Sequence, residues 1–507
     1  MTDAGLLLQS PADAARWLRT HVSGALHADS RRVLDGDGFV AWPGARVDAR
    51  RFVGAALAAG AAACLVERAG AAELALPDSD RVVAYEGLKA ACGEIASIFY
   101  GQPSRALRLV AVTGTNGKTS TAWWLTAALS ALAHPELSPC ALVGTLGAGP
   151  LDALEPTGLT TPDPVLLQSR LADFVREGLR SCALEASSIG LAEQRLVGTH
   201  VDVAVFTNFS PDHLDYHHDM AAYWDAKRAL FDRPELRAAV VNLDDARGSE
   251  LAAHARARGV DTWPVSLQGR PGARLSASVL TRNALGALCW RVHEGERVVE
   301  MQSSLIAEYN AANVMGVIAA LRALHVPLAD AVQACAQLPP VPARLEHVAV
   351  PGAPLAIVDF AHTPDALQHV LEALKPLARQ RQGRLWCLFG CGGNRDASKR
   401  PLMAAVAEAL ADQVVITSDN PRDEDPLAIV LQVKAGLRRP ADVRVEPDRA
   451  QAIRHVLMHE AGINDVVLIA GKGHETWQEI AGEKWPFSDR SHARAALRAR
   501  VGTGVQA

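Results

Sequence analysis

The chain lacks the features that mark a membrane protein, an exported protein or a nucleic-acid binder. No run of about 18 apolar residues occurs, so we expect no membrane span. The first residues carry no basic stretch followed by an apolar one, which argues against export. The net charge is −5 and acids and bases are mixed along the chain, so we expect no nucleic-acid partner. These absences predict a cytoplasmic protein.

Cysteine is scarce and scattered. The eight cysteines lie mostly in apolar stretches, which is typical of buried thiols in a reducing compartment. Cys387 and Cys391 are four residues apart, but no second pair accompanies them. The sequence therefore does not favour a structural metal site.

The length of the chain predicts several domains. With 507 residues it is too long for one core, and we expect three domains at residues 1–104, 105–339 and 340–507. In the first domain we expect a helix at residues 52–62 and a strand at residues 63–67. In the second, continuous apolar runs alternate with helical stretches, which predicts a parallel sheet covered by helices on both faces. The strands are expected at 107–113, 140–144, 181–184, 201–206 and 238–243.

The rest of the chain completes an α/β fold. Residues 272–305 are β-rich and predict a small antiparallel insert, and a helix is expected at 307–324. The third domain repeats the α/β rhythm and is expected to be Rossmann-like, with strands near 355–359, 384–389, 413–417 and 465–470.

The segment Thr113-Gly-Thr-Asn-Gly-Lys-Thr119 is the strongest local signal. It follows an apolar run and precedes a helical run at 122–132, the strand–loop–helix order of a phosphate-binding loop. Backbone N–H groups and the helix N-terminus would face the anion, Lys118 would add a charge, and the Thr119 hydroxyl can hold Mg²⁺. The two glycines are only three residues apart, so the loop is a shortened variant. The alternative is an ordinary glycine-rich turn, but Lys-Thr at the helix start favours phosphate.

Polar clusters follow many of the predicted strands. Ligands of such sheets bind at the carboxyl ends of strands, so these clusters predict a site shared between domains. They lie at residues 113–119, 185–188, 207–213, 359–362, 390–395, 418–422 and 471–475.

Two of these clusters offer metal chemistry. Glu185 ends a predicted strand beside the phosphate loop, where a carboxylate suits Mg²⁺; the alternative is a helix N-cap region using Ser187 and Ser188. His213 and His217 have the i, i+4 spacing of a zinc site. Because Pro211 is close and no third ligand is obvious, a polar loop near the nucleotide is favoured over zinc.

The third domain carries charges suited to an amino acid. Arg395 and Arg422 are planar forks that fit a carboxylate, and Glu475 can pair with an ammonium. Two forks and one acid suit a zwitterion, while the alternative is a set of weak surface ion pairs.

Short motifs recur along the whole chain, and each alone is weak. They are Ala28-Asp-Ser-Arg31, Thr113-Gly-Thr-Asn-Gly-Lys-Thr119, Thr160-Thr-Pro162, Glu185-Ala-Ser-Ser188, His213-Leu-Asp-Tyr216, Tyr309-Asn-Ala-Ala-Asn313, Ala343-Arg-Leu-Glu346, Asp359-Phe-Ala-His-Thr-Pro364, Gly390-Cys-Gly-Gly393, Asp419-Asn-Pro-Arg422 and Gly471-Lys-Gly-His-Glu475. Together, their order and spacing are specific and resemble those of the Mur ligases of peptidoglycan synthesis.

The resemblance implies a three-domain Mur ligase architecture with a uridine-nucleotide domain, a central ATP domain and a C-terminal amino-acid domain that closes over the site. Catalytic roles fall to Lys118, His213 and Lys227. The implied ATP contacts are Gly114, Thr115, Asn116, Gly117, Lys118, Thr119, Ser120, Asn310, Arg344, Asp359 and His362. The implied contacts of the uridine-linked muramoyl dipeptide are Ser30, Thr160, Thr161, Ser187 and Arg195.

The resemblance also implies two Mg²⁺ ions and a carbamylated lysine. Thr119, Glu185, His213 and Lys227 would be the ligands, the last as its carbamate, which turns an ammonium into an anionic oxygen donor. The implied protein is a monomer.

The Asp-Asn-Pro-Arg motif is similar to that of family members that use meso-diaminopimelate rather than lysine. Diaminopimelate has a second amino-acid head, whose carboxylate the two arginines can bind, while the same arginines left unpaired penalise lysine. The implied amino-acid contacts are Arg395, Asp419, Asn420, Pro421, Arg422, Gly471 and Glu475.

Four positions depart from the family's pattern. Ile189 stands where histidine is common, Glu193 where glutamine is, Leu159 where asparagine is, and Ala307 where glycine is. They concern mainly the muramoyl-peptide contacts and leave the nucleotide chemistry intact.

The implied reaction joins meso-diaminopimelate to UDP-N-acetylmuramoyl-L-alanyl-D-glutamate using ATP, through an acyl phosphate. Alternatives are another Mur or folylpolyglutamate-type ligase, a P-loop kinase or switch ATPase, and a non-catalytic nucleotide-sugar binder. The Asp-Ser-Arg and Asp-Asn-Pro-Arg motifs argue against another ligase. A switch would ignore free diaminopimelate.

Overall fold

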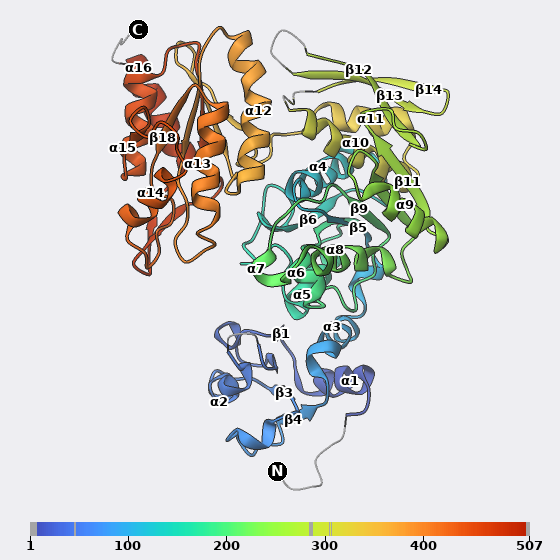
Figure 1. The fold of residues 1–507 in the computed structure, drawn as a ribbon. Coiled ribbons are helices and arrows are strands. Elements are labelled where there is room, and N and C mark those ends of the chain that lie inside the picture. The colour runs from blue at the N-terminus through green and yellow to red at the C-terminus, as the bar shows by residue number, and fades with distance from the viewer. Residues whose placement is uncertain (1–7, 45–46, 283–286, 304, 306, 503–507) are drawn as a thin grey trace. The chain divides into compact units, whose positions relative to one another are not determined.

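The computed structural model describes residues 8–44, 47–282, 287–303, 305 and 307–502 (Figure 1). Its contacts divide the chain into two compact units. Unit 1 comprises Met1–Val279, Trp290–Met301 and Ala312–Leu338, and unit 2 comprises Leu280–Cys289, Gln302–Ala311 and Pro339–Ala507. The domain boundaries expected after residues 104 and 339 stay predictions.

The N-terminal part of unit 1 is a four-stranded parallel sheet with the order β1-β2-β3-β4. Its elements are α1 (Pro11–His21), β1 (Leu26–His27), β2 (Gly38–Ala41), α2 (Val53–Ala58), β3 (Ala63–Glu67), β4 (Val82–Tyr85) and α3 (Leu88–Phe99). The predicted strand at 63–67 is confirmed, but the helix expected at 52–62 ends at Ala58. Gly60 explains the early end, because its φ of +100° is left-handed and a Cβ there would lie 2.8 Å from Asp35.

The central sheet has ten strands in the order β14-β13-β12-β11-β10-β9-β5-β8-β6-β7. Its strands are β5 (Arg108–Thr113), β6 (Cys140–Gly144), β7 (Gly147–Gly149), β8 (Ser181–Glu185), β9 (Val203–Phe206), β10 (Ala238–Asn242), β11 (Asp261–Ser266), β12 (Leu275–Arg282), β13 (Leu288–Glu294) and β14 (Arg297–Gln302). The accompanying helices are α4 (Lys118–Ala131), α5 (Pro164–Arg176), α6 (Ser188–Ala192), α7 (Leu214–His217), α8 (Met220–Arg228), α9 (Gly248–Ala257), α10 (Glu308–Ala323) and α11 (Leu328–Ala336). The five predicted strands are confirmed as β5, β6, β8, β9 and β10.

The middle of this sheet is buried on both faces, which explains its unbroken apolar runs. Every residue of β6, β8 and β9 is buried. Side chains of α5, α8 and α9 pack against one face in a single apolar cluster. α4 contacts β6 and β8 and also packs on α11. The expectation of a helix-covered parallel sheet is met here.

The β-rich segment expected at 272–305 extends the central sheet instead of forming a separate insert. β12 pairs with β11 in parallel, with Leu275 opposite Val265. β13 and β14 continue the order to the sheet edge. Residues 283–286, 304 and 306 lie outside the described residues.

Unit 2 contains a six-stranded sheet with the order β15-β16-β20-β17-β18-β19, parallel except for the edge strand β15. Its strands are β15 (Glu346–Val348), β16 (Leu355–Asp359), β17 (Leu385–Phe389), β18 (Gln413–Ile416), β19 (Arg444–Val445) and β20 (Val466–Ala470), and a separate hairpin comprises β21 (Trp477–Ile480) and β22 (Glu483–Pro486). Its helices are α12 (Pro364–Gln380), α13 (Lys399–Leu410), α14 (Pro426–Lys434), α15 (Arg449–His455) and α16 (Asp489–Gly502).

Helices cover both faces of this sheet, as the Rossmann-like expectation requires (Figure 1). Successive strand residues point to opposite faces, so Ile357 packs with α12, α13 and α14, while Val358 packs with α15 and α16. Polar loops at the carboxyl ends of β16, β17, β18 and β20 therefore gather at one edge of the sheet.

Candidate functional site

A strand, a glycine loop and a helix form the predicted phosphate loop of unit 1. β5 ends at Thr113 and α4 begins at Lys118, four residues earlier than the expected helical run. A Cβ at Gly114, where φ is +147°, would lie 1.9 Å from Thr207 Oγ1. A Cβ at Gly117, where φ is +85°, would lie 2.6 Å from Asn313 Oδ1. Only glycine fits these two positions, because each has a positive φ and neither leaves room for a Cβ.

The segment after β9 holds this loop in place. The Thr115 N–H donates to the Asn208 carbonyl at 2.8 Å, and the Asn116 N–H donates to Asn208 Oδ1 at 2.9 Å. The Thr207 hydroxyl and Asn208 Nδ2 both donate to the Asn116 carbonyl, at 2.6 and 3.0 Å. The loop is therefore shaped by contacts about 90 residues away in sequence, between Asn116 and Asn208.

Two lysines meet at the carbonyl of Gly114. Lys118 Nζ donates to it at 2.8 Å, and Lys227 Nζ donates to it at 2.7 Å. Lys227 is 1% exposed, and its Nζ lies 4.3 Å from the centre of the Tyr223 ring. Burial, and then the charge of Lys118, holds the pKa of Lys227 well below its ordinary value. A neutral amine is the form that reacts with CO₂, so this environment fits the implied carbamate.

Glu185 is fully buried where β8 ends. Its Oε2 accepts from the Thr119 hydroxyl at 2.9 Å and its Oε1 accepts from the Thr145 N–H at 2.7 Å. A Cβ at Gly144 would lie 2.2 Å from Oε1, so only glycine admits the carboxylate. A buried carboxylate beside a hydroxyl at the start of α4 is an oxygen donor set that fits Mg²⁺.

Most of the expected muramoyl-peptide contacts lie next to Glu185. The Thr161 hydroxyl donates to the Glu185 carbonyl at 2.7 Å and lies 3.0 Å from Ser187 Oγ. Arg195 Nη1 donates to the Thr161 carbonyl at 3.0 Å, and the Thr160 hydroxyl lies 3.0 Å from that of Thr145. Ser187 also caps α6, so its N-cap role and its predicted binding role coexist.

Ser30 belongs to the N-terminal part of the unit. It is half-buried and begins the short 3₁₀ helix Ser30–Arg32, which Asp29 caps. Its predicted role with the uridine nucleotide stays a prediction.

The unusual Glu193 is anchored by two partners. Its Oε2 lies 2.7 Å from Lys89 Nζ, and its Oε1 accepts from the Tyr216 hydroxyl. The hydrogen bond from Lys89, then that from Tyr216, lowers the pKa of Glu193 below its ordinary value. Leu159, another departure, is 46% exposed.

His213 precedes the four-residue helix α7, where only a loop was expected. It has a φ of +52°, and its Nε2 lies 3.5 Å from Asp212 Oδ2. Burial lowers the pKa of His213. The carboxylate of Asp212 raises this pKa, whereas the charges of Lys118 and Lys227 lower it further. Within the described ranges, no group of three or more His, Cys, Asp or Glu side chains is arranged to hold a metal ion.

The expected nucleotide residues of unit 2 lie around the end of β16. Asp359 accepts from the Leu345 N–H at 2.7 Å and from the Ala361 N–H at 2.8 Å. Burial raises the pKa of Asp359, and Arg344 opposes that shift. The Arg344 guanidinium lies 4.9 Å from the centre of the Phe360 ring, and the His362 ring centre lies 4.7 Å from that of Phe360. Asn310, in the first turns of α10, is buried.

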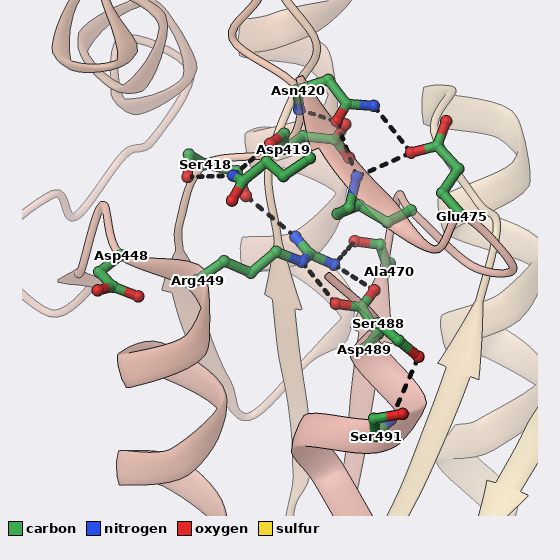
Figure 2. A network of polar contacts seen from close by, with 12 residues as sticks. Ser418, Asp419, Asn420, Asp448, Arg449, Ala470, Glu475, Ser488, Asp489 and Ser491 are labelled. Atoms are coloured by element: carbon green, nitrogen blue, oxygen red, sulfur yellow. Dashed lines mark hydrogen bonds and ion pairs between the residues drawn. The ribbon is translucent and has the colours of Figure 1, made fainter. Parts of the chain in front are cut away.

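A second polar cluster follows β18 and β20 (Figure 2). Asn420 Nδ2 donates to Glu475 Oε2 at 2.8 Å, and Asp419 Oδ1 accepts from the Asn420 N–H at 2.6 Å. Gly471 has a φ of +115°, and a Cβ there would lie 2.5 Å from Asp419 Oδ2. The structure thus brings together four of the predicted amino-acid contacts.

The two predicted arginine forks lie beside Gly392. A Cβ at that glycine would lie 3.0 Å from Arg422 Nη1 and 3.8 Å from Arg395 Cγ. Arg395 is exposed, whereas Arg422 donates from Nη1 to the Gly393 carbonyl at 2.7 Å and pairs through Nε with Glu479 at 3.3 Å. Pro421 packs its carbonyl toward Gly393, where a Cβ would lie 1.9 Å away.

A buried ion pair lies next to this cluster and holds its backbone. Arg449 donates from Nε and Nη2 to Asp489 at 2.7 and 2.8 Å, and both side chains are 0% exposed (Figure 2). Its guanidinium also donates to the carbonyls of Ser418, at 3.2 Å, and Ala470, at 2.9 Å. These carbonyls directly precede Asp419 and Gly471, so Arg449 fixes both strand ends.

Family sequence patterns match the two parts of the chain that carry these clusters. The Mur ligase middle domain matches residues 112–321, and the Mur ligase, glutamate ligase domain matches residues 343–473. A UDP-N-acetylmuramoyl-L-alanyl-D-glutamate–2,6-diaminopimelate ligase of Acidovorax sp. (strain JS42) is 58% identical, with 97% of each chain covered. The chain belongs to the Mur ligase family. A Mur ligase of the same name from Janthinobacterium sp. (strain Marseille) is 44% identical over 96% of this chain and 97% of its own.

Solved Mur ligase structures share the fold. A structure of a UDP-N-acetylmuramoyl-L-alanyl-D-glutamate–2,6-diaminopimelate ligase matches with a TM-score of 0.65 at 34% identity, covering 94% of this chain and 95% of its own. The MurF ligase of Thermotoga maritima in complex with ADP matches with a TM-score of 0.66 at 18% identity, covering 95% and 98%. Together these findings confirm the expected Mur ligase fold.

Several side chains of this Mur ligase were not chosen from sequence. Asn208 and Tyr223 shape the phosphate loop, and Asn313 lies against Gly117. Asn313 lies in the 309–313 motif three positions after the predicted Asn310, a spacing that puts both on one helix face. Lys472, inside the 471–475 motif, is fully buried. No helix among the described segments has the length and apolarity needed to cross a membrane.

Proposed function

We propose that this Mur ligase joins meso-diaminopimelate to UDP-N-acetylmuramoyl-L-alanyl-D-glutamate with cleavage of ATP to ADP and phosphate. The observation that carries the proposal is the 58% identity, over 97% of both chains, to a ligase named for that reaction. The phosphate loop of unit 1 and the charged cluster of unit 2 supply the two kinds of site that the reaction needs.

In the first step, an oxygen of the D-glutamate side-chain carboxylate attacks the γ-phosphorus, and ADP leaves. Both reactants are anions, so positive charge and backbone N–H groups must offset their repulsion. The N-terminus of α4 and Lys118 provide these groups at the loop. Thr161, Ser187 and Arg195 would orient the acceptor carboxylate beside Glu185.

Thr119 and Glu185 would hold one Mg²⁺, and His213 with Lys227 as its carbamate a second. Bound Mg²⁺ supplies charge that neutralises phosphate oxygens. The fit rests on this chain's own donors. The Glu185–Thr119 pair is buried and made of oxygens, and burial disfavours the charged form of the Lys227 amine.

In the second step, the amine of diaminopimelate attacks the acyl carbon, phosphate leaves, and the nitrogen loses a proton. Arg395 and Arg422 would bind the far carboxylate and Glu475 the adjacent ammonium. Lysine lacks that carboxylate, so it would forgo the bonds to these arginines and bind less well.

Phosphate release tests the proposal against a simple ATPase. Purified protein with ATP and Mg²⁺ should release phosphate only when both the UDP-dipeptide and meso-diaminopimelate are present. Release that proceeds equally without the amino acid would contradict the ligase function and favour a switch ATPase.

A further inference from the structure

A buried lysine lies inside the amino-acid cluster of unit 2 and has no role in the reaction as described so far. Lys472 follows β20, and its side chain is 0% exposed. Burying an ammonium is costly unless its protons meet acceptors. Its Nζ donates to Asn420 Oδ1 at 2.8 Å and to Glu475 Oε2 at 2.8 Å. Both acceptors belong to the predicted diaminopimelate contacts.

These contacts fix the orientation of the Asn420 amide. Its Oδ1 accepts from Lys472 Nζ and from the Glu479 N–H at 3.0 Å, so Oδ1 faces two donors. The Nδ2 group must then face Glu475 Oε2, to which it donates at 2.8 Å. A flipped amide would set Nδ2 against an ammonium and an N–H, which are donors only.

The same contacts divide the two oxygens of Glu475. Oε2 accepts from both Lys472 and Asn420. Oε1 accepts no hydrogen bond from any residue in the described part of the chain. One oxygen is thus committed to the protein, whereas the other has no such partner, on a side chain that is 20% exposed.

We propose that Lys472 is a positioning residue of the amino-acid site, holding Glu475 Oε2 and Asn420 Oδ1 so that Glu475 Oε1 meets the ammonium of the diamino acid. The inference rests on the proposed function and deepens it. A second model, in which Lys472 only balances charge, makes the opposite prediction. Without Lys472 the cluster is more negative, and an ammonium would then bind more tightly.

The test uses the full-length enzyme and the substitution Lys472→Met. Steady-state kinetics should show KM for meso-diaminopimelate raised by about tenfold or more, the loss expected when a charged hydrogen-bond partner is misplaced. KM for ATP and for the UDP-dipeptide should stay within about twofold of the wild type, because their sites lack Lys472. Lys484→Met is the matched control, because both lysines lie near the same aromatic ring. The Nζ atoms of Lys484 and Lys472 lie 4.3 and 5.6 Å from the centre of the Trp477 ring, but Lys484 is exposed.

A double-mutant cycle separates positioning from general damage. If Lys472 acts through Glu475, adding Lys472→Met to Glu475→Gln should change KM for diaminopimelate by less than about twofold. Independent, multiplicative effects would overturn the proposal. So would an unchanged or lowered KM for diaminopimelate, or an equal rise for all three substrates with a lower melting temperature.

Lys472→Gln covers the case in which the methionine variant does not fold, and it should show the same selective rise. If neither variant folds, Lys472 belongs to the core and the proposal is overturned. A wild-type enzyme that needs no diaminopimelate for turnover would refute the proposed function. An active wild type with normal Lys472→Met kinetics would refute only the role of Lys472.

Discussion

The buried pair of Arg449 and Asp489 should dominate the stability of unit 2, and Asp489→Asn tests this. Both side chains are 0% exposed and joined by two hydrogen bonds at 2.7 and 2.8 Å. Asparagine keeps the shape but leaves the guanidinium without its counter-charge. Breaking such a pair from one side costs about 3–5 kcal/mol. At about 2–4 °C per kcal/mol for a unit of this size, the melting temperature should fall by about 6–20 °C.

The assay is calorimetry of the full-length protein, with Asp442→Asn as control. Arg439 and Asp442 form an exposed pair at 3.8 Å, with side chains 72% and 65% exposed, which should contribute at most about 1 kcal/mol. Arg449 also binds the carbonyls before Asp419 and Gly471, so KM for diaminopimelate should rise in Asp489→Asn while KM for the UDP-dipeptide stays unchanged. A melting shift no larger than that of Asp442→Asn would refute the reasoning.

Three further substitutions test other parts of the account. Lys227→Ala should lower turnover by about 100-fold or more, as expected when electrostatic stabilisation is removed, and a small added carboxylic acid should restore part of it; near-normal turnover without the acid would remove the carbamate. Arg422→Ala should raise KM for diaminopimelate by about 10–150-fold, the equivalent of 1.5–3 kcal/mol, and unchanged kinetics would count against the specificity argument. Burial, and then Arg344, lowers the pKa of His474 to about 4, so the unfolded chain binds more protons between about pH 4 and 6.5 and stability must fall as pH drops through that window, by at most about 3 kcal/mol. His474→Gln should flatten this fall in acid-unfolding curves, and an identical slope would contradict it.

The sheets could be predicted because their strands are buried on both faces. The runs that form β9 and β20 are continuous and apolar, so they can only be buried on both faces of a sheet. Edge elements were harder to predict. The strand β12 alternates enough to resemble an independent insert, yet its first residues pair with β11, a contact that sequence periodicity does not encode.

The phosphate loop was visible in sequence, whereas its surroundings were not. The spacing of Gly114, Gly117 and Lys118 is local and requires a tight turn. Lys227 looks like any helical lysine, because its acceptor, the Gly114 carbonyl, lies 113 residues away in sequence. Its special environment, a buried amine next to another cation, arises only when α8 packs against the loop.

The amino-acid cluster, too, could be predicted only in part from the sequence. Arg422 and Glu475 carry charges at strand ends that suit an amino acid, and Asp419 and Asn420 lie in a motif that resembles that of Mur ligases. Lys472 gives no such signal in the sequence, because lysine is usually exposed and only the fold reveals that it is buried against Asn420 and Glu475.

Mass spectrometry of the reaction product tests the central claim most directly. The purified enzyme would receive ATP, Mg²⁺ and UDP-N-acetylmuramoyl-L-alanyl-D-glutamate, with meso-diaminopimelate or lysine in separate reactions. The account predicts a UDP-linked tripeptide heavier than the dipeptide by one diaminopimelate residue, and little or no lysine product. A lysine adduct formed as readily, or no adduct at all while ATP is consumed, would contradict it.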